Sequence, residues 1–312
     1  MNVPTTTNPP ESKKPRVKAA MLDLSGTLHV GDRALSGAID GVEELRKNGI
    51  LLKFVTNTSK ESRQSLLRRL RSLGFSVGDE EIHSSLTAAR LKARKENLKP
   101  LLLLSDSALE EFVDDTDGNV ANGRVGSVHG SEDFDSVIVG LAPDRFNHES
   151  MTTALDILLN GGRLIAINKG RYYKAEDGRL KAGVGCFVAG LEYGASVEAE
   201  IVGKPTPTFF EAALQTLRQQ QTGSSSSLSS SSSPLRNDEV VMIGDDFKDD
   251  ILGARAVGCK GILVRTGKYR SGDGEKATAT TSSCDGAETF LSPDAICDDF
   301  AEAVRLILDC GI

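Results

Sequence analysis

Residues 17–28 read VKAAMLDLSGTL, an apolar run that ends at Asp23 and is followed at once by a Ser25-Gly26 turn. Short apolar runs bounded by turn residues are typical of strands buried on both faces of a parallel sheet. An acid at the end of such a strand is held by a rigid backbone, and its carboxylate is open to a ligand and can act as a nucleophile. The stretch therefore predicts an α/β fold with Asp23 as its candidate catalytic residue.

The rest of the chain alternates between short apolar runs and segments with helical spacing. This alternation predicts a doubly wound, Rossmann-like parallel sheet with right-handed crossovers. Two Thr-x-x-Glu patterns, Thr58 to Glu61 and Thr208 to Glu211, predict capped helix starts. Further strands are expected at 51–56, 101–104, 137–139, 164–167, 201–202, 240–243 and 261–264, and helices near 39–47, 148–159 and 293–308.

The same alternation predicts two α/β units. Residues 17–84 and 196–312 are expected to form the Rossmann-like core, with residues 85–195 as an inserted α/β unit, and the first sheet resumes at 201–202. Residues 1–16 are polar and proline-rich, which predicts a disordered tail. Residues 222–236 are rich in serine, which buries no apolar area, and are expected to form a flexible surface insertion.

Composition excludes several classes of protein. The 312 residues are 39% hydrophobic and 26% charged, with a formal net charge of -7. A negative balance argues against a nucleic-acid binder, which would carry a basic face. No run reaches the roughly 18 apolar residues of a membrane span, and the start of the chain lacks the apolar stretch of a secretory signal. The five cysteines show no C-x-x-C spacing, which argues against disulfides or zinc and predicts a cytoplasmic location.

Five polar residues come just after predicted strands: Asp23, Thr56, Asn57, Lys204 and Asp245. Carboxyl ends of parallel strands meet at one edge of a doubly wound sheet, so these side chains are expected to lie together. Taken singly, they fit a turn residue, helix-entry caps, a surface lysine and a charged first helical turn. The order and spacing of the four segments, each at a strand end, favour a functional site.

These residue types suit phosphoryl transfer with Mg²⁺. A carboxylate approaches a phosphate dianion only when charge is neutralised, and Mg²⁺ held by one or two carboxylates and water provides this. Asp23 and Asp245 are the expected metal ligands, with the backbone carbonyl of Ser25 as a third. Lys204 would keep Asp23 ionised and bind the phosphoryl oxygens.

The remaining candidates surround this centre. Thr56 and Asn57 would bind phosphate through hydroxyl, amide and backbone donors at a helix start. Asp250 and Asp246 would orient Lys204 or a metal-bound water. A basic and aromatic loop at 169–174 holds Arg171, Tyr172 and Tyr173. That loop either contacts the leaving group or is an ordinary solvated hairpin.

The four segments together resemble the motifs of the haloacid dehalogenase superfamily of phosphatases. The resemblance covers nearly everything from about residue 17 to residue 270, and the insert resembles the α/β cap of one subgroup. It implies that Asp23 is the nucleophile and a Mg²⁺ ligand, that Asp245 and the Ser25 carbonyl complete the protein ligands, and that a small phosphorylated substrate is bound. Because such caps often form dimer contacts, it also implies a homodimer through the cap. The motifs stand here as Asp23-Leu24-Ser25-Gly26-Thr27, Val55-Thr56-Asn57-Thr58, Gly203-Lys204-Pro205 and Gly244-Asp245-Asp246 through Asp250.

Ser25 departs from the superfamily pattern, which has a second aspartate there to protonate the leaving oxygen and activate water. Such acid–base help is worth about 10²–10⁴ in rate, and serine does not supply it near neutral pH. Three outcomes follow: a slow enzyme, an enzyme for substrates whose leaving group needs no acid (a phosphoramidate or a pyrophosphate), or a protein that only binds phosphate ligands. The leading hypothesis is a phosphohydrolase working through an aspartyl-phosphate at Asp23. Its rival is a weakly catalytic binding or regulatory protein.

Overall fold

The computed structural model describes residues 17–113, 134–174, 179–223, 233–272, 279–282, 288–310 and 312. The predicted tail at residues 1–16 lies outside the described residues, as does the centre of the serine-rich segment, 224–232.

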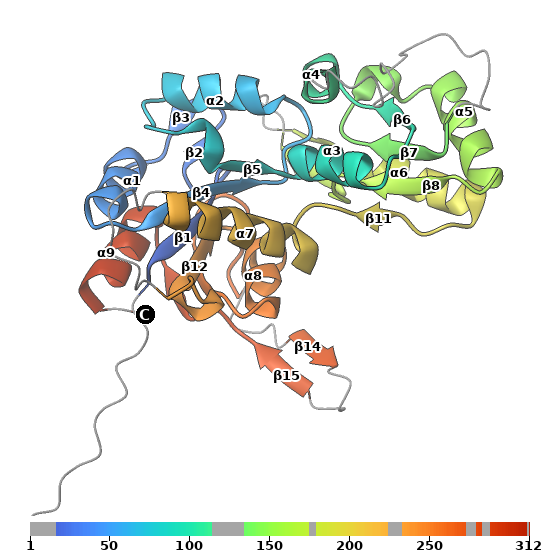
Figure 1. Cartoon of the computed structure of the whole chain (residues 1–312). Helices are drawn as coiled ribbons and strands as arrows, with labels where there is room; N and C mark the ends of the chain where they lie inside the picture. Colours follow the sequence, from blue (N-terminus) through green and yellow to red (C-terminus); the bar gives the residue numbers. More distant parts are fainter. Residues whose placement is uncertain are drawn as a thin grey trace, which may run out of the picture.

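A parallel sheet of six strands carries the first α/β unit, in the order β16-β13-β12-β1-β4-β5 (Figure 1). The central strand β1 is buried along its whole length, as its apolar sequence predicts. It lies between β12 and β4, so the residues that follow these three strands are neighbours. The strands are β1 (Ala19–Asp23), β4 (Leu51–Thr56), β5 (Ile82–Ser84), β12 (Val240–Gly244), β13 (Lys260–Val264) and β16 (Ala295–Cys297).

Helices cover both faces of this sheet, which confirms the doubly wound class. Apolar side chains of β1 alternate between the faces: Leu22 packs in one cluster and Met21 in the other. The Leu22 cluster holds α1 (Ala38–Lys47), α2 (Arg63–Ser72) and α9 (Phe300–Cys310), and the Met21 cluster holds α7 (Pro207–Gly223) and α8 (Gly253–Ala256).

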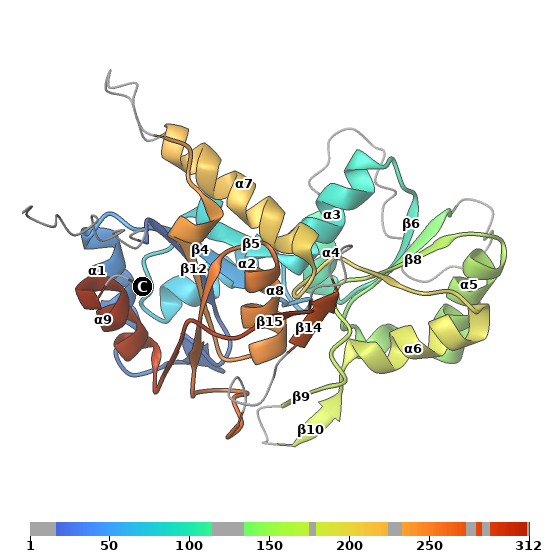
Figure 2. The same ribbon diagram turned by 90° about the horizontal axis from the view of Figure 1, so that it is seen from below.

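A second parallel sheet, of four strands in the order β11-β8-β7-β6, stands beside the first (Figure 1). Its helices again lie on two faces, with α3 and α4 in one apolar cluster and α5 and α6 in the other. A hairpin of β9 (Tyr172–Lys174) and β10 (Leu180–Ala182) projects from this unit (Figure 2). The other elements are α3 (Ser85–Lys95), β6 (Pro100–Leu103), α4 (Asp106–Val113), β7 (Ser136–Val139), α5 (His148–Leu159), β8 (Arg163–Ala166), α6 (Val184–Ala195) and β11 (Glu200–Ile201).

Four local expectations are wrong. The strand at 201–202 does not resume the first sheet, because β11 pairs with β8 in the second; a two-residue run has no periodicity that could assign it to a sheet. The Thr58 box does not cap α2. Ser62 does so, accepting a hydrogen bond from Ser65 N at 3.2 Å, while Glu61 pairs with Arg69.

The other two concern helix starts. Helix α7 begins at Pro207, so Thr208 is inside it. The last helix begins at Phe300, and the residues before it include the edge strand β16. Among the described helices, none has both the length and the apolar character that a membrane span requires.

His83, in β5, makes the fold sensitive to acid. Its ring is buried against Phe209, with ring centroids 4.6 Å apart. Burial, and after it the charge of Lys53, lowers the pKa of His83 to about 4. The unfolded chain takes up this proton near pH 6.5, so stability should fall as pH drops from about 6.5 towards 4. We expect the buried His83 to make the free energy of unfolding about 2 kcal/mol lower at pH 5 than at pH 8.

Urea unfolding of the wild type and of His83→Gln at both pH values measures this contribution. The variant should lose about 2 kcal/mol less than the wild type on acidification. An equal loss in both proteins would assign the acid sensitivity to other groups.

Candidate active site

The predicted residues meet at the carboxyl edge of the six-stranded sheet. Asp23 ends β1, Thr56 ends β4, and Asp245 follows β12 directly. Lys204 arrives from the other unit, three residues beyond β11. Residues separated by more than two hundred positions therefore share one site, which is where ligands bind in doubly wound sheets.

Lys204 is held between two carboxylates. Its Nζ lies 2.5 Å from Asp23 Oδ1 and 2.6 Å from Asp250 Oδ1, and all three residues are buried. Burial works to lower the pKa of Lys204, but the attraction of Asp23 and Asp250 raises it above its ordinary value. The lysine is therefore a fixed positive charge beside the candidate nucleophile.

Three acids lie close enough together to share a cation. Asp23, Asp245 and Asp250 each present a carboxylate oxygen, and these oxygens lie within 4.8 Å of one another. Asp245 Oδ1 is buried and has no hydrogen-bond partner among the described residues. Burial, and then repulsion from Asp23, raises the pKa of Asp245 to about 7. An orphaned buried oxygen among like charges fits a hard divalent cation, which would relieve both penalties.

A loop at residues 265–270 packs against Asp245 and holds its carboxylate in place. Lys268 N donates to Asp245 Oδ2 at 2.6 Å, and Thr266 Oγ1 donates to the carbonyl of Gly26 at 2.6 Å. Gly26 and Gly267 approach Asp245 so closely that a Cβ at either position would collide with its carboxylate. Both glycines also adopt positive φ angles, 101° and 53°. No role could be predicted for this loop from the sequence, in which its signal is a Thr-Gly pair just beyond a buried strand.

The side chains of Asn57 and Thr56 make hydrogen bonds within the protein. Asn57 Oδ1 accepts from Lys204 N at 2.8 Å, and Asn57 Nδ2 donates to the Lys204 carbonyl at 3.0 Å. Thr56 Oγ1 accepts from Thr58 N at 3.2 Å. The Asn57 side chain therefore positions the backbone of Lys204, and phosphate binding by Thr56 and Asn57 stays a prediction.

The two outer acids have different surroundings. Asp250 Oδ1 contacts Lys204 directly, which is the position expected of a residue that orients the lysine. Asp246 Oδ1 instead caps the turn after β12, accepting from Lys248 N at 3.1 Å and Asp249 N at 2.9 Å. Ser25 is exposed, two residues beyond Asp23.

The predicted basic and aromatic loop comes back to the core. Tyr172, in β9, accepts a hydrogen bond at its hydroxyl from Arg270 Nη2 at 3.2 Å. The Arg171 guanidinium lies 5.6 Å from the centre of the Tyr172 ring. The Tyr173 side chain is outside the described part of the chain. Asn168 also bridges the units, since its Nδ2 donates to the Asn57 carbonyl at 3.0 Å.

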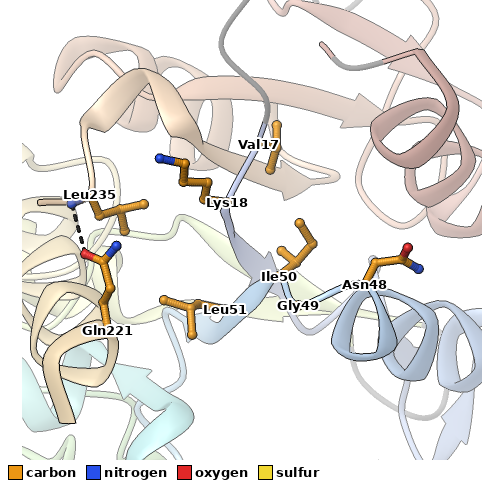
Figure 3. A pocket seen from close by; sticks show the side chains of 8 residues that line it. All are labelled: Val17, Lys18, Asn48, Gly49, Ile50, Leu51, Gln221 and Leu235. Atoms are coloured by element: carbon orange, nitrogen blue, oxygen red, sulfur yellow. Dashed lines mark hydrogen bonds between the residues drawn. The ribbon is translucent and has the colours of Figure 1, made fainter. Parts of the chain in front are cut away.

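A separate hollow of about 330 Å³ lies at the opposite edge of the sheet, where β1 and β4 begin (Figure 3). One wall includes Leu235, whose N donates to Gln221 Oε1 at 3.0 Å. The strands run away from this edge towards Asp23, so the hollow is not part of the carboxylate site. It is lined by Val17, Lys18, Asn48, Gly49, Ile50, Leu51, Gln221 and Leu235.

Comparisons with known proteins define the class. A haloacid dehalogenase-like hydrolase model matches residues 20–118, and a HAD-hydrolase-like model matches residues 201–303. Haloacid dehalogenase-like hydrolase domain-containing protein 2 from Pongo abelii is 42% identical over 294 residues, covering 94% of this chain and 96% of that protein. The chain belongs to the haloacid dehalogenase-like hydrolases and is a phosphatase of that superfamily, which confirms the resemblance of its motifs.

Two further relatives have named activities. Phospholysine phosphohistidine inorganic pyrophosphate phosphatase from Xenopus laevis is 34% identical over 307 residues, covering 95% of this chain and 97% of that protein. The solved p-nitrophenyl phosphatase from Archaeoglobus fulgidus matches with a TM-score of 0.73 at 26% identity, covering 93% of this chain and 99% of the other.

Proposed function

We propose that this protein is a Mg²⁺-dependent phosphohydrolase that works through an aspartyl-phosphate at Asp23. One observation carries the proposal: Asp23 is paired with a buried lysine, and one of its carboxylate oxygens lies within 4.8 Å of oxygens of Asp245 and Asp250, so that these acids could share a cation. Asp23, Asp245 and the carbonyl of Ser25 would hold Mg²⁺, which neutralises charge where the nucleophile meets the phosphate.

The reaction needs two displacements at phosphorus. First, a carboxylate oxygen of Asp23 forms a bond to phosphorus, and the leaving group departs with the electron pair of the bond that breaks. Water then attacks the same phosphorus, the bond to Asp23 breaks, and orthophosphate leaves with the carboxylate regenerated. Lys204 would bind the phosphoryl oxygens in both steps, with Asp250 holding its ammonium and Asn57 holding its backbone.

The leaving group is the point on which substrate choice turns. With Ser25 in place of an acid, the reaction favours groups that depart without protonation from the protein, such as those of a P–N bond or a pyrophosphate. The named activity of the Xenopus laevis relative, which covers both kinds of bond, supports this choice. The alternative is a catalytically weak phosphate-binding or regulatory protein that retains the fold, and Ser25 is the residue that favours it.

The second α/β unit would act as the cap. We propose that residues 85–195 close over the site and choose substrates, with β11 attached to that unit, and that two copies pair through their caps. The acidic chain would work on small phosphorylated molecules in the cytoplasm rather than on nucleic acid.

Removing the metal tests the proposed function. Hydrolysis of p-nitrophenyl phosphate, pyrophosphate and a panel of phospho-amino acids should fall at least about 100-fold in EDTA, since the cation supplies several kcal/mol of stabilisation. Added Mg²⁺ should restore it. Turnover that is indifferent to EDTA contradicts the proposal, and Mg²⁺-dependent phosphate binding without any turnover favours the alternative.

A further inference from the structure

The loop that holds Asp245 also places a second, exposed lysine beside the acids of the site. Lys268 Nζ lies 3.3 Å from Asp246 Oδ2, and the Lys268 side chain is 65% exposed. Partial loss of water around its ammonium opposes the charge, yet Asp246, Asp23, Asp250 and Asp245 together raise the pKa of Lys268 above its ordinary value. Its ammonium therefore lies in the field of the catalytic acids, on their solvent side.

The position of Lys268 is fixed by its backbone. Lys268 N is bonded to Asp245, and the neighbouring Thr266 is tied to Gly26. The ammonium of Lys268 has three N–H donors, and the ion pair with Asp246 uses only part of them. Asp246 also accepts from Lys248 N and Asp249 N, so its charge is shared among several donors. Lys268 is thus a cation whose backbone is held in place and whose ammonium can still donate hydrogen bonds to a ligand.

Arg270, two residues further on, reaches the second α/β unit. Its Nη2 donates to the Tyr172 hydroxyl at 3.2 Å, so the Lys268 loop and the β9–β10 hairpin meet at this contact. Lys204 lies deep between Asp23 and Asp250 with a side chain only 3% exposed, whereas Lys268 stands outward from them. The two lysines therefore divide the site into an inner and an outer positive region.

We propose that Lys268 and Arg270 form a subsite for an anionic leaving group, so that the preferred substrate is pyrophosphate rather than a phosphorylated amine. The proposal rests on the proposed function and assigns the leaving side of that same site. Lys204 would hold the phosphoryl group that is transferred, and the outer pair would hold the group that departs.

The charge balance of the reaction gives the reason. In pyrophosphate, Asp23 bonds to one phosphorus while the bond from that phosphorus to the bridging oxygen breaks. The bridging oxygen keeps the electron pair and leaves as part of orthophosphate, an anion that needs no proton from residue 25. Two fixed cations stabilise the charge that develops on that oxygen. The nitrogen of a phosphorylated amine is protonated before its bond to phosphorus breaks, and it leaves with the electron pair as a neutral amine, which the two cations do not stabilise.

The test compares Lys268→Gln with Lys248→Gln, a matched loss of one positive charge at an exposed residue nearby. At fixed free Mg²⁺, kcat/KM is measured for pyrophosphate and for phospholysine, whose leaving group is an amine and not an anion. Because Lys268→Gln removes a hydrogen bond from a charged group, we expect the ratio of the two kcat/KM values to fall about 10- to 100-fold. Lys248→Gln should leave the ratio unchanged, Lys268→Arg should keep most of it, and Arg270→Gln should lower it.

Equal losses on both substrates in Lys268→Gln would show that Lys268 only supports Asp245, and would overturn the subsite. A wild type that hydrolyses neither substrate would refute the proposed function instead. In that case, binding of methylenediphosphonate and of orthophosphate with Mg²⁺ still tests the subsite. A lower affinity ratio in Lys268→Gln supports it, and an unchanged ratio overturns it.

Discussion

Replacing Asp23 with asparagine should abolish phosphatase turnover, with a loss of about 10⁴-fold or more, the scale seen when a covalent nucleophile is removed. The side chain keeps its shape, and Lys204 keeps its 2.6 Å contact with Asp250, so the site should still assemble. Asparagine has no anionic oxygen to attack phosphorus or to help hold Mg²⁺. The measurement is kcat for p-nitrophenyl phosphate and pyrophosphate at saturating Mg²⁺.

Asp32→Asn is the matched control, because Asp32 is an exposed acid in the hairpin of β2 (His29–Val30) and β3 (Arg33–Ala34), and its loss removes the same charge. Acid quenching of the wild type during turnover should trap one phosphoryl group on Asp23, detected by peptide mass spectrometry. Robust turnover by Asp23→Asn, or a phosphoryl group trapped on another residue, would end the aspartyl-phosphate mechanism.

The meeting of Asp23 and Asp245 could be predicted because it follows from strand geometry: each comes at the end of a buried apolar run, and parallel strands bring their carboxyl ends to one edge. Lys204 joins them by a different route than expected, because β11 belongs to the second sheet and the lysine comes from that unit. Carboxylates of residues 23 and 245 separated by a nanometre could not have shared an ion; their oxygens, with one of Asp250, lie within 4.8 Å. Residue type and position in the strand pattern were enough for this part of the site.

The clamp around Asp245 could not be predicted in the same way. It depends on the backbone N–H of Lys268 and on two glycines that leave room for a carboxylate, and neither feature gives a chemical signal in a sequence. The partner of Asn57 was missed for a related reason. Its amide could serve phosphate or backbone equally well, and only the position of β11 brings Lys204 against it. A strand of two residues does not reveal its own sheet.

Replacing Ser25 with aspartate should raise turnover of phosphomonoesters with poor leaving groups, by up to about 10²–10⁴. Ser25 is exposed and two residues from Asp23, so a carboxylic acid there gains access to the departing oxygen. Pyrophosphate should gain little, because its leaving group needs no proton. A series of aryl and alkyl phosphates at several pH values measures the effect. The dependence of rate on leaving-group acidity should flatten in the variant.

Ser25→Asn separates acid catalysis from shape, because the amide has nearly the same size as the acid and cannot donate a catalytic proton at neutral pH. A gain shared by both variants would assign the effect to packing. No gain, or a loss, in Ser25→Asp would mean that a missing acid does not limit this site. The repulsion between the added carboxylate and Asp23, Asp245 and Asp250 would then slow the reaction more than its proton speeds it. The absence of an acid at residue 25 would no longer be a reason to expect pyrophosphate as the substrate. The contacts of Lys268 would then be the remaining support for that substrate.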